Sequence, residues 1–401
     1  MTTDRFNVLR RNKFYLFWCR FFVDLNALNA VVQLFYLQRG LSLSEIYITG
    51  VAWSLGTLIF DIPSSYLADH WGRRKTILTG VLINVFASAY LFWAYGFWSF
   101  FIYTFVFAIS YSFFFGVEDA LLYDTLREMK QEGVVLKTAG KYASAGRLSK
   151  VFIPLLGVVI AKDLLPSQFN VLLSINLISS CIAVYFAWGL VEPKRFTEKF
   201  KSELNAFSDG LKTFLDSVVL RSFAFNKSLI FIASFVFWRY YQNALLDFGF
   251  SVFLLGLIYP VSNALIVLFF IFLPKISTWF ERVKIMNNVV YLTLFSFIVF
   301  IFTQNTLALY VCSIILLTIA TIRDPLFTQQ IQWRLKSFNR ATTGSILGIF
   351  KGVSDIPVLL LSGYLSSLGG KYVLVLPVIL TLIVIIFFRI KKEYILSEPA
   401  A

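Results

Sequence analysis

The hydrophobic positions of this chain gather in long runs rather than in an alternating pattern. A helix needs about 20 mostly apolar residues to cross the hydrocarbon of a bilayer. The runs predict twelve membrane-spanning helices, with approximate bounds 14–37, 45–68, 76–96, 98–124, 141–162, 168–190, 221–247, 250–273, 284–303, 305–330, 344–366 and 371–390. These runs are too long, and alternate too little in polarity, for the strands of a membrane β-barrel.

The composition agrees with a membrane protein. Hydrophobic residues make up 58% of the chain and charged residues only 14%, and the mean hydropathy is +0.75. A soluble domain has about a quarter of its residues charged, so this chain has too few charges to cover a water-facing surface. The expected fold class is therefore all-α and integral to the membrane.

The basic residues indicate the topology. The chain has 36 Lys and Arg against 22 Asp and Glu. Most of the Lys and Arg fall in alternate connections, and only Arg39, Lys162 and Lys371 fall on the other side. Because cytoplasmic loops are enriched in Lys and Arg, both termini are expected in the cytoplasm, and the bilayer is expected to be a bacterial inner membrane. The basic clusters form no stripe on a folded domain, so a nucleic-acid partner is not expected.

Candidate catalytic and metal-binding chemistry is sparse. Cys19, Cys181 and Cys312 each lie in an apolar run without a pairing or metal-ligand spacing, and His70 is the single histidine. The sequence shows no set of nucleophile, histidine and acid and no phosphate-binding loop. An enzyme, a disulfide framework and a bound cofactor are therefore not expected. We expect instead a monomer whose partner is a small-molecule solute, with a proton as the coupling ion.

The chain divides near its middle. The longest polar stretch, 191–220, separates a bundle of six predicted spans (1–190) from a second such bundle (221–401). Apolar residues within this stretch recur every three or four positions, which predicts an amphipathic linker helix on the membrane surface. Matching residues recur about half a chain apart, which indicates a duplicated unit: Arg20 and Lys227, Glu118-Asp119 and Arg323-Asp324, Arg147 and Lys351, Pro154 and Pro357.

The loop between the second and third predicted spans contains a distinctive motif. It reads Ser65-Tyr66-Leu67-Ala68-Asp69-His70-Trp71-Gly72-Arg73-Arg74-Lys75. Gly72 permits a tight turn between two neighbouring helices, and Asp69 can accept a charge-assisted hydrogen bond. The motif resembles the signature loop of the major facilitator superfamily, G-x-L-x-D-x-x-G-R-R/K, with Ser65 in place of the opening glycine.

The resemblance implies a fold of two six-helix bundles around a central cavity lined by spans one, four, seven and ten. It also implies a cytoplasmic gate, in which Asp69, Gly72 and Arg73 help to close the cytoplasmic side. The acidic partner of Arg73 would be Asp124, at the end of span four. The corresponding loop of the second half, Lys275 to Lys284, has no Asp at the equivalent place.

Several charged residues fall inside predicted spans, where an unpaired charge costs several kcal/mol. In the first half they lie at a similar depth and sum to zero, and in the second half they sum to +1, so one ion-paired layer is expected in each half. The members are Arg20, Asp24, Glu118, Asp119, Arg147 and Lys150 in the first half, and Lys227, Arg323, Asp324, Lys351 and Asp355 in the second. Two interpretations remain open. The layers are structural clamps, or one of the acids Glu118, Asp119, Asp24 and Asp61 transfers the coupling proton.

Substrate contacts are expected nearer the midplane. Asn26, Asn29 and Gln33 share one helical face of the first predicted span, and Arg239 and Asn243 share a face of the seventh. These polar side chains either line the cavity or form hydrogen bonds between helices.

Three functions are compatible with these features. The first is proton-coupled efflux of a small organic compound by alternating access. The second is proton-coupled uptake of an organic anion, with Arg239 as the anion ligand. The third is a receptor-like member of the fold that does not transport, which the substituted Ser65 and the incomplete second loop allow. The sequence does not identify the solute.

Overall fold

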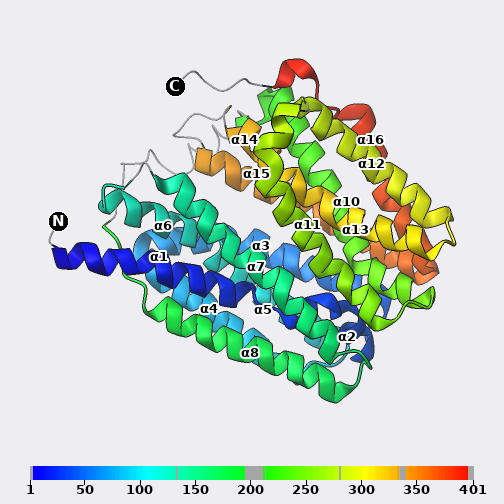
Figure 1. Cartoon of the computed structure of the whole chain (residues 1–401), viewed down its shortest axis with the longest axis horizontal. Coiled ribbons are helices and arrows are strands. Elements are labelled where there is room, and N and C mark those ends of the chain that lie inside the picture. Colours follow the sequence, from blue (N-terminus) through cyan, green and yellow to red (C-terminus); the bar gives the residue numbers. More distant parts are fainter. Residues whose placement is uncertain are drawn as a thin grey trace. The chain divides into compact units, whose positions relative to one another are not determined.

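The structure is a computed structural model of the 401-residue chain, and it describes residues 3–131, 134–194, 211–212, 214–279, 281–332, 334 and 340–395. The chain forms two compact units. The N-terminal unit comprises residues 1–42 and 48–199, and the C-terminal unit comprises residues 43–47 and 200–401. Both units are helical, and no strand occurs in the described ranges. In Figure 1 the colours run from blue to green through the first unit and from green to red through the second.

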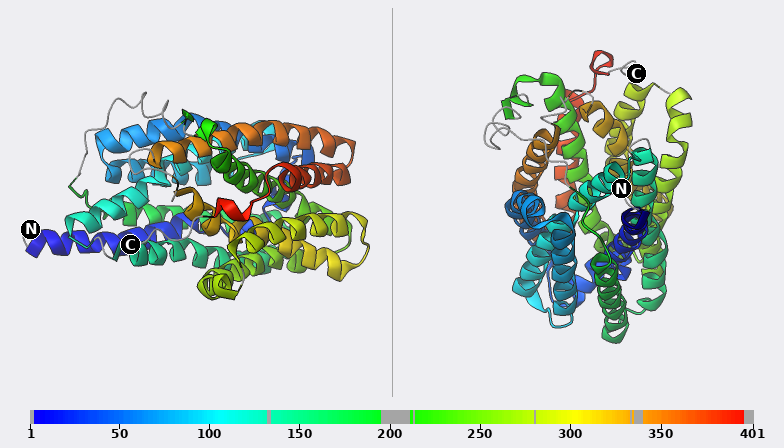
Figure 2. Two further views of the ribbon diagram at one scale, coloured as in Figure 1. Left: turned by 90° about the horizontal axis from the view of Figure 1, so that it is seen from above. Right: turned by 90° about the vertical axis from the view of Figure 1, so that its left-hand side faces the viewer.

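The described part of the N-terminal unit contains eight α-helices and the 3-10 turn η1, with the first five residues of α3 grouped with the other unit. They are α1 (Thr3–Asp24), η1 (Ala27–Ala30), α2 (Val32–Gln38), α3 (Leu43–Trp71), α4 (Arg73–Tyr90), α5 (Gly96–Phe114), α6 (Val117–Glu128), α7 (Val135–Ile160) and α8 (Pro166–Trp188). Helix α1 packs between α7 and α8, and α4 packs against α5 and α8. The left view of Figure 2 shows α1, in dark blue, extending from the N-terminus alongside the teal and green helices of its unit.

The described helices of the C-terminal unit form a second bundle. They are α10 (Val218–Asp247), α11 (Val252–Trp279), α12 (Arg282–Phe302), α13 (Thr306–Ile322), α14 (Asp324–Gln332), α15 (Arg340–Leu368), η4 (Gly370–Leu374), α16 (Val375–Phe387) and η5 (Lys392–Tyr394). Helix α10 packs against α13 and α16, and α11 packs against α13. Most of the predicted linker helix (residues 195–210 and 213) lies outside the described residues, so that helix stays a prediction.

Ten helices of the described chain are long and apolar enough to cross a membrane. Their bounds agree within a few residues with ten of the twelve predicted spans. The other two are the first and the third. Helix α4 begins with Arg73, Arg74 and Lys75, and these charges lower the apolar character of its 18 residues. The count of twelve spans is therefore supported for ten helices and rests on the sequence for these two.

The first predicted span is not one continuous helix. Helix α1 ends at Asp24, and the chain forms the 3-10 turn η1 before it resumes as α2. The side chain of Asn26 caps η1 by accepting a hydrogen bond from the backbone N–H of Leu28. An Asn side chain that binds its own backbone in this way competes with a continuous helix. The interruption therefore has a local cause.

Spans four and ten are interrupted at matching places. Helix α5 ends at Phe114 and α6 begins at Val117, with Gly116 between them at a φ of +88°. In the C-terminal unit α13 ends at Ile322 and α14 begins at Asp324. Gly readily adopts this left-handed backbone conformation. The break precedes Glu118 and Asp119 in the N-terminal unit, and it falls at Arg323, directly before Asp324, in the C-terminal unit.

Small residues allow close packing in the N-terminal unit. A Cβ added at Gly56 of α3 would meet Ala108 Cβ of α5 at 2.6 Å. A Cβ at Gly157 of α7 would overlap the backbone carbonyl oxygen of Ala27 in η1. Small residues at such contacts let helix backbones approach closely inside a membrane bundle. Gly157 therefore provides the space into which the interrupted first span packs.

Candidate functional site

The N-terminal unit contains a cluster of four charged side chains from three helices, which we name the charge cluster: Arg20, Asp24, Glu118 and Lys150. Arg20 Nε contacts Asp24 Oδ2 at 2.7 Å, and Arg20 Nη1 contacts Glu118 Oε1 at 2.5 Å. Lys150 Nζ contacts Asp24 Oδ1 at 3.0 Å. The two cations balance the two carboxylates. The predicted ion pair between Arg20 and Asp24, one helical turn apart, is present.

The break between α5 and α6 positions Glu118. This residue lies in the first turn of α6, where the helix dipole favours a negative charge. Glu118 is fully buried, and its Oε2 atom has no hydrogen-bond partner among the described residues. Each unpaired buried oxygen costs free energy. The carboxyl group therefore keeps one oxygen on Arg20 and has the other available for a proton.

Aromatic and small residues enclose the charge cluster. The guanidinium of Arg20 lies 4.1 Å from the centre of the Phe115 ring and 5.7 Å from that of Tyr142. A Cβ at Gly146 of α7 would overlap Asp24 Oδ2. A cation over an aromatic face is stabilised by the ring quadrupole. The role of Gly146 could not be predicted from the sequence, because a glycine in an apolar helix has many possible roles.

Two amide side chains hold the interrupted first span. Asn176 of α8 donates from Nδ2 to Asn26 Oδ1 at 3.0 Å and accepts from the backbone N–H of Ala27 at 2.8 Å. The predicted common helical face of Asn26, Asn29 and Gln33 is therefore wrong, because the helix ends before it reaches them. Asn29 lies in η1 and Gln33 is buried in α2. Of the two roles left open for Asn26, the geometry supports hydrogen bonding between helices.

The motif loop forms the ion pair that the resemblance implied. Arg73 Nη1 contacts Asp124 and also donates to the backbone oxygen of Ala120. Gly72 has a φ of +109°, so the turn uses the conformational freedom expected of this glycine. Asp69 is exposed near the end of α3. The role of these residues as a cytoplasmic gate remains a proposal.

Glu192 is a functional candidate that the sequence did not reveal. Its Oε1 and Oε2 atoms accept hydrogen bonds from the backbone N–H groups of Arg73 and Arg74 at 2.9 and 2.8 Å. A carboxylate at this place satisfies free N–H groups at the start of α4. Nearby, Arg5 Nε contacts Glu128 Oε1 at 2.8 Å. No fixed sequence spacing connects Glu192 to residue 73, so only the fold brings them together.

We expect Arg73→Gln to lower the free energy of unfolding by about 1.5–3 kcal/mol, as for the loss of a hydrogen-bonded charged group. Asp124 is largely buried and would lose its cation. The neighbouring Lys75 is exposed, so Lys75→Gln is the matched control and should leave stability unchanged. Thermal melting of the purified variants in detergent measures both effects. Equal melting temperatures for the two variants would contradict the prediction.

The predicted charge layer of the C-terminal unit is not a single cluster. Lys227 Nζ contacts Asp324 Oδ1 at 2.8 Å, and Lys351 Nζ contacts Asp355 Oδ2 at 3.8 Å. Arg323 is buried and donates to the side-chain oxygen of Asn226. The expected pairing of Lys351 with Asp355 is present, and among the described residues the charges of this unit pair without forming one connected cluster. The first pair joins α10 to α14, and the second lies within α15.

The remaining predicted residues lie as follows. Asp119 is exposed beside Glu118 and makes no salt bridge to a described residue, and Arg147 is half-buried on α7. Asp61 is exposed on α3 and accepts a hydrogen bond from the Ser112 hydroxyl.

In α10, Arg239 is buried, and its guanidinium lies 4.1 Å from the centre of the Phe235 ring, whereas Asn243 is half-buried. Within the described chain, no three His, Cys, Asp or Glu residues gather in a way that could hold a metal ion.

The sequence profile of the Major Facilitator Superfamily matches residues 16–360. No curated protein matches the chain. Solved transporter structures share the fold at low identity. A mutant of the nucleoside transporter NupG matches with a TM-score of 0.75 and 13% identity, covering 96% of this chain and 98% of that one.

Two further structures show the same likeness. A bacterial homologue of the human lysosomal transporter Spinster, in an inward-facing and occupied conformation, has a TM-score of 0.74 and 14% identity, with 100% of both chains covered. A D-xylose–proton symporter has a TM-score of 0.66 and 14% identity, covering 95% of this chain and 97% of that one. At these identities the likeness shows the fold alone.

Proposed function

The chain belongs to the major facilitator superfamily, and from this premise we propose that it is a proton-coupled exporter of a small organic solute. Membership makes the protein an integral membrane transporter of the secondary-carrier type and not an enzyme. The solute, the direction and the coupling ion are the proposed part. Transport proceeds by alternating access, in which two six-helix repeats expose a central site to each side in turn.

The observation that supports proton coupling is the state of Glu118. One of its oxygens is bound to Arg20, and the other is buried with no hydrogen-bond partner in the described part of the chain. Protonation of Oε2 removes the negative charge and weakens the ion pair with Arg20. Loss of the proton restores the pair. A buried carboxyl group whose ion pair depends on its protonation can couple proton movement to a change of conformation.

We expect Glu118→Gln to abolish proton flux that depends on the solute, because a glutamine cannot release a proton. Asp119→Asn is the matched control, since Asp119 is the exposed neighbour without a salt bridge to a described residue. The measurement is a pH jump in proteoliposomes containing a pH-sensitive dye, with a broad panel of aromatic and amphipathic compounds. If Asp119→Asn abolished the flux and Glu118→Gln did not, Glu118 would not be the carrier.

The same assay distinguishes the rival functions. Export by antiport moves protons against the solute, whereas uptake by symport moves both in one direction. The symport alternative is supported by Arg239, a buried cation beside the rings of Phe235 and Trp238 that suits an organic anion. Co-movement of protons with anions alone would favour symport over export. No proton flux with any compound would count against proton coupling and would favour a receptor-like member.

A further inference from the structure

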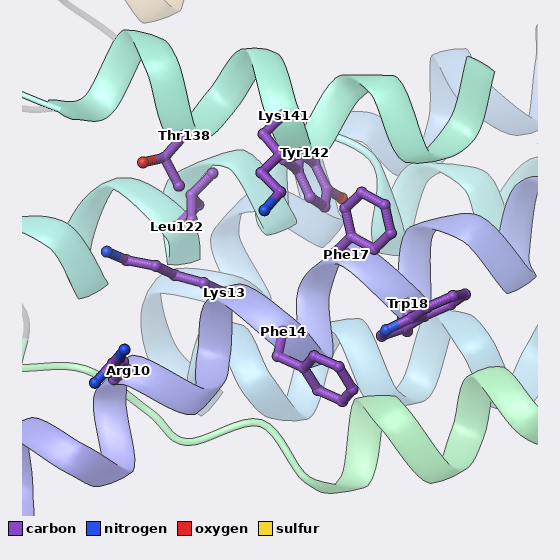
Figure 3. A pocket seen from close by; sticks show the side chains of 9 residues that line it. All are labelled: Arg10, Lys13, Phe14, Phe17, Trp18, Leu122, Thr138, Lys141 and Tyr142. Carbon is purple, nitrogen blue, oxygen red and sulfur yellow. The ribbon is translucent and has the colours of Figure 1, made fainter. Parts of the chain in front are cut away.

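A pocket of about 670 Å³ opens within the N-terminal unit between α1, α6 and α7. Figure 3 shows Lys13 on α1 and Lys141 on α7 on opposite sides of the same space, with Arg10 toward one end and Trp18 toward the other. The lining residues are Arg10, Lys13, Phe14, Phe17, Trp18, Leu122, Thr138, Lys141 and Tyr142. Three of them are basic, four are aromatic and none is acidic. Neither Arg20 nor Glu118 lines this pocket, although its Tyr142 also lies beside Arg20.

Among the described residues, none of the three cations of the pocket makes a salt bridge. Lys13 Nζ donates one hydrogen bond, to Gln131 Oε1 at 2.8 Å, and a protonated amine has three donors. Partial burial, and then the nearby charge of Arg10, lower the pKa of Lys13. A bound anion would reduce the repulsion between these like charges.

The basic pocket of the C-terminal unit has a different character. It measures about 820 Å³, and its lining includes Lys284, Lys392 and the acidic residue Glu281. Glu281 contacts Lys392 at 3.3 Å and Lys284 at 3.9 Å. Two cations of that pocket therefore have an internal counterion, and the pocket between α1, α6 and α7 is the better candidate for an external anion.

The polarity of this pocket changes along α1. Arg10 and Lys13 precede Phe14, Phe17 and Trp18, and positions 10 and 18 are about 12 Å apart along the helix axis. The aromatic rings form one wall, because the Trp18 ring lies 6.3 Å from Phe14 and 5.4 Å from Phe17. Phe14 is 57% exposed. The arrangement fits a molecule with an anionic head and an apolar body.

The position of the pocket indicates where such a molecule comes from. The candidate membrane span of α7 begins at Thr138, so Thr138, Lys141 and Tyr142 lie in its first two turns. The first predicted membrane span of the chain begins within α1, directly after Lys13. Both helices therefore place the cations where the hydrocarbon meets the lipid headgroups, and basic pockets at this level bind anionic headgroups.

We propose that this pocket binds an anionic phospholipid, with the phosphate between Arg10, Lys13 and Lys141 and the first part of an acyl chain against Phe14, Phe17 and Trp18. The cations attract the phosphate by charge-assisted hydrogen bonds. The aromatic wall excludes water from the apolar part of the lipid. The bilayer supplies this ligand directly at the level of the pocket.

The test measures binding of short-chain phosphatidylglycerol and phosphatidylcholine to the purified full-length protein in detergent by microscale thermophoresis. Phosphatidylglycerol is expected to bind more tightly than the zwitterionic lipid. The triple variant Arg10→Gln/Lys13→Gln/Lys141→Gln is expected to bind phosphatidylglycerol about a hundredfold more weakly, because each basic residue near a membrane surface contributes about 1 kcal/mol, or roughly a fivefold change in affinity.

The control is the triple variant Arg11→Gln/Lys130→Gln/Lys162→Gln, which removes the same charge from exposed residues outside the pocket. It is expected to keep the wild-type affinity. Lys141→Arg should also keep it. Because the pocket triple variant could lose its fold, the single variant Lys141→Gln provides an independent test with an expected loss of about fivefold.

Three results would overturn the proposal. The first is equal affinity for the two lipids. The second is unchanged phosphatidylglycerol affinity in both the folded pocket triple variant and Lys141→Gln. The third is binding of soluble phenyl phosphate as tight as that of phosphatidylglycerol, since the pocket would then be a site for soluble anions.

Discussion

Replacing Arg20 with leucine is expected to lower the free energy of unfolding by about 3–5 kcal/mol, as when one partner of a buried ion pair is removed. The variant leaves the carboxylates of Asp24 and Glu118 with one cation, Lys150, which contacts Asp24. Both carboxylates are buried from solvent. The measurement is unfolding of the purified protein in mixed micelles with increasing SDS, followed by circular dichroism.

A second variant separates the loss of charge balance from a loss of packing. The double variant Arg20→Leu/Glu118→Leu removes one charge of each sign, so Asp24 and Lys150 remain balanced. It should recover much of the stability, because replacing both partners of a buried pair by apolar residues is often close to neutral. Arg11→Gln, at an exposed position of the same helix, should change stability by less than about 0.5 kcal/mol. Strictly additive losses in the double variant would show that the pair is not coupled.

Replacing Gly157 with alanine is expected to destabilise the protein by about 3 kcal/mol, the upper range for overpacking in a core. The added methyl group would overlap the backbone carbonyl oxygen of Ala27, and backbone in η1 cannot move as a flexible side chain can. The change should also weaken the hydrogen bond between the Ala27 N–H and Asn176, because η1 would be pushed away from α7. The measurement is again the free energy of unfolding in mixed micelles.

The same helix offers a matched control. Gly140 of α7 has no atom within 4 Å of an added Cβ. Gly140→Ala should therefore leave stability unchanged or raise it by up to about 1 kcal/mol, since alanine favours a helix over glycine. If Gly157→Ala were as stable as Gly140→Ala, the close packing of α7 against η1 would be wrong.

Local patterns predicted local features of the site. Arg20 and Asp24 are four residues apart, and a helix places such residues on one face, so their ion pair could be expected. The pairing of Arg73 with Asp124 followed from the resemblance of the motif loop to a known family. The turn at Gly72 followed from the conformational freedom of glycine.

Contacts between distant segments could not be predicted in the same way. Arg20 and Glu118 are 98 positions apart, and Asn26 and Asn176 are 150 apart. Nothing in the spacing of these residues indicates that they meet. The common face proposed for Asn26, Asn29 and Gln33 assumed an unbroken helix, and the break depends in part on the partner amide from α8.

The sequence by itself determined that the chain is a helical membrane protein, where most of its spans lie and which residues bring charge into them. These properties depend on the partition of apolar runs and basic clusters between hydrocarbon and water, which composition along the chain controls. The tertiary structure decided where the spans break, which charges of the N-terminal unit form one cluster and which residues line its basic pocket. Those features depend on atoms supplied by other helices, and only the packed bundle brings these atoms within reach.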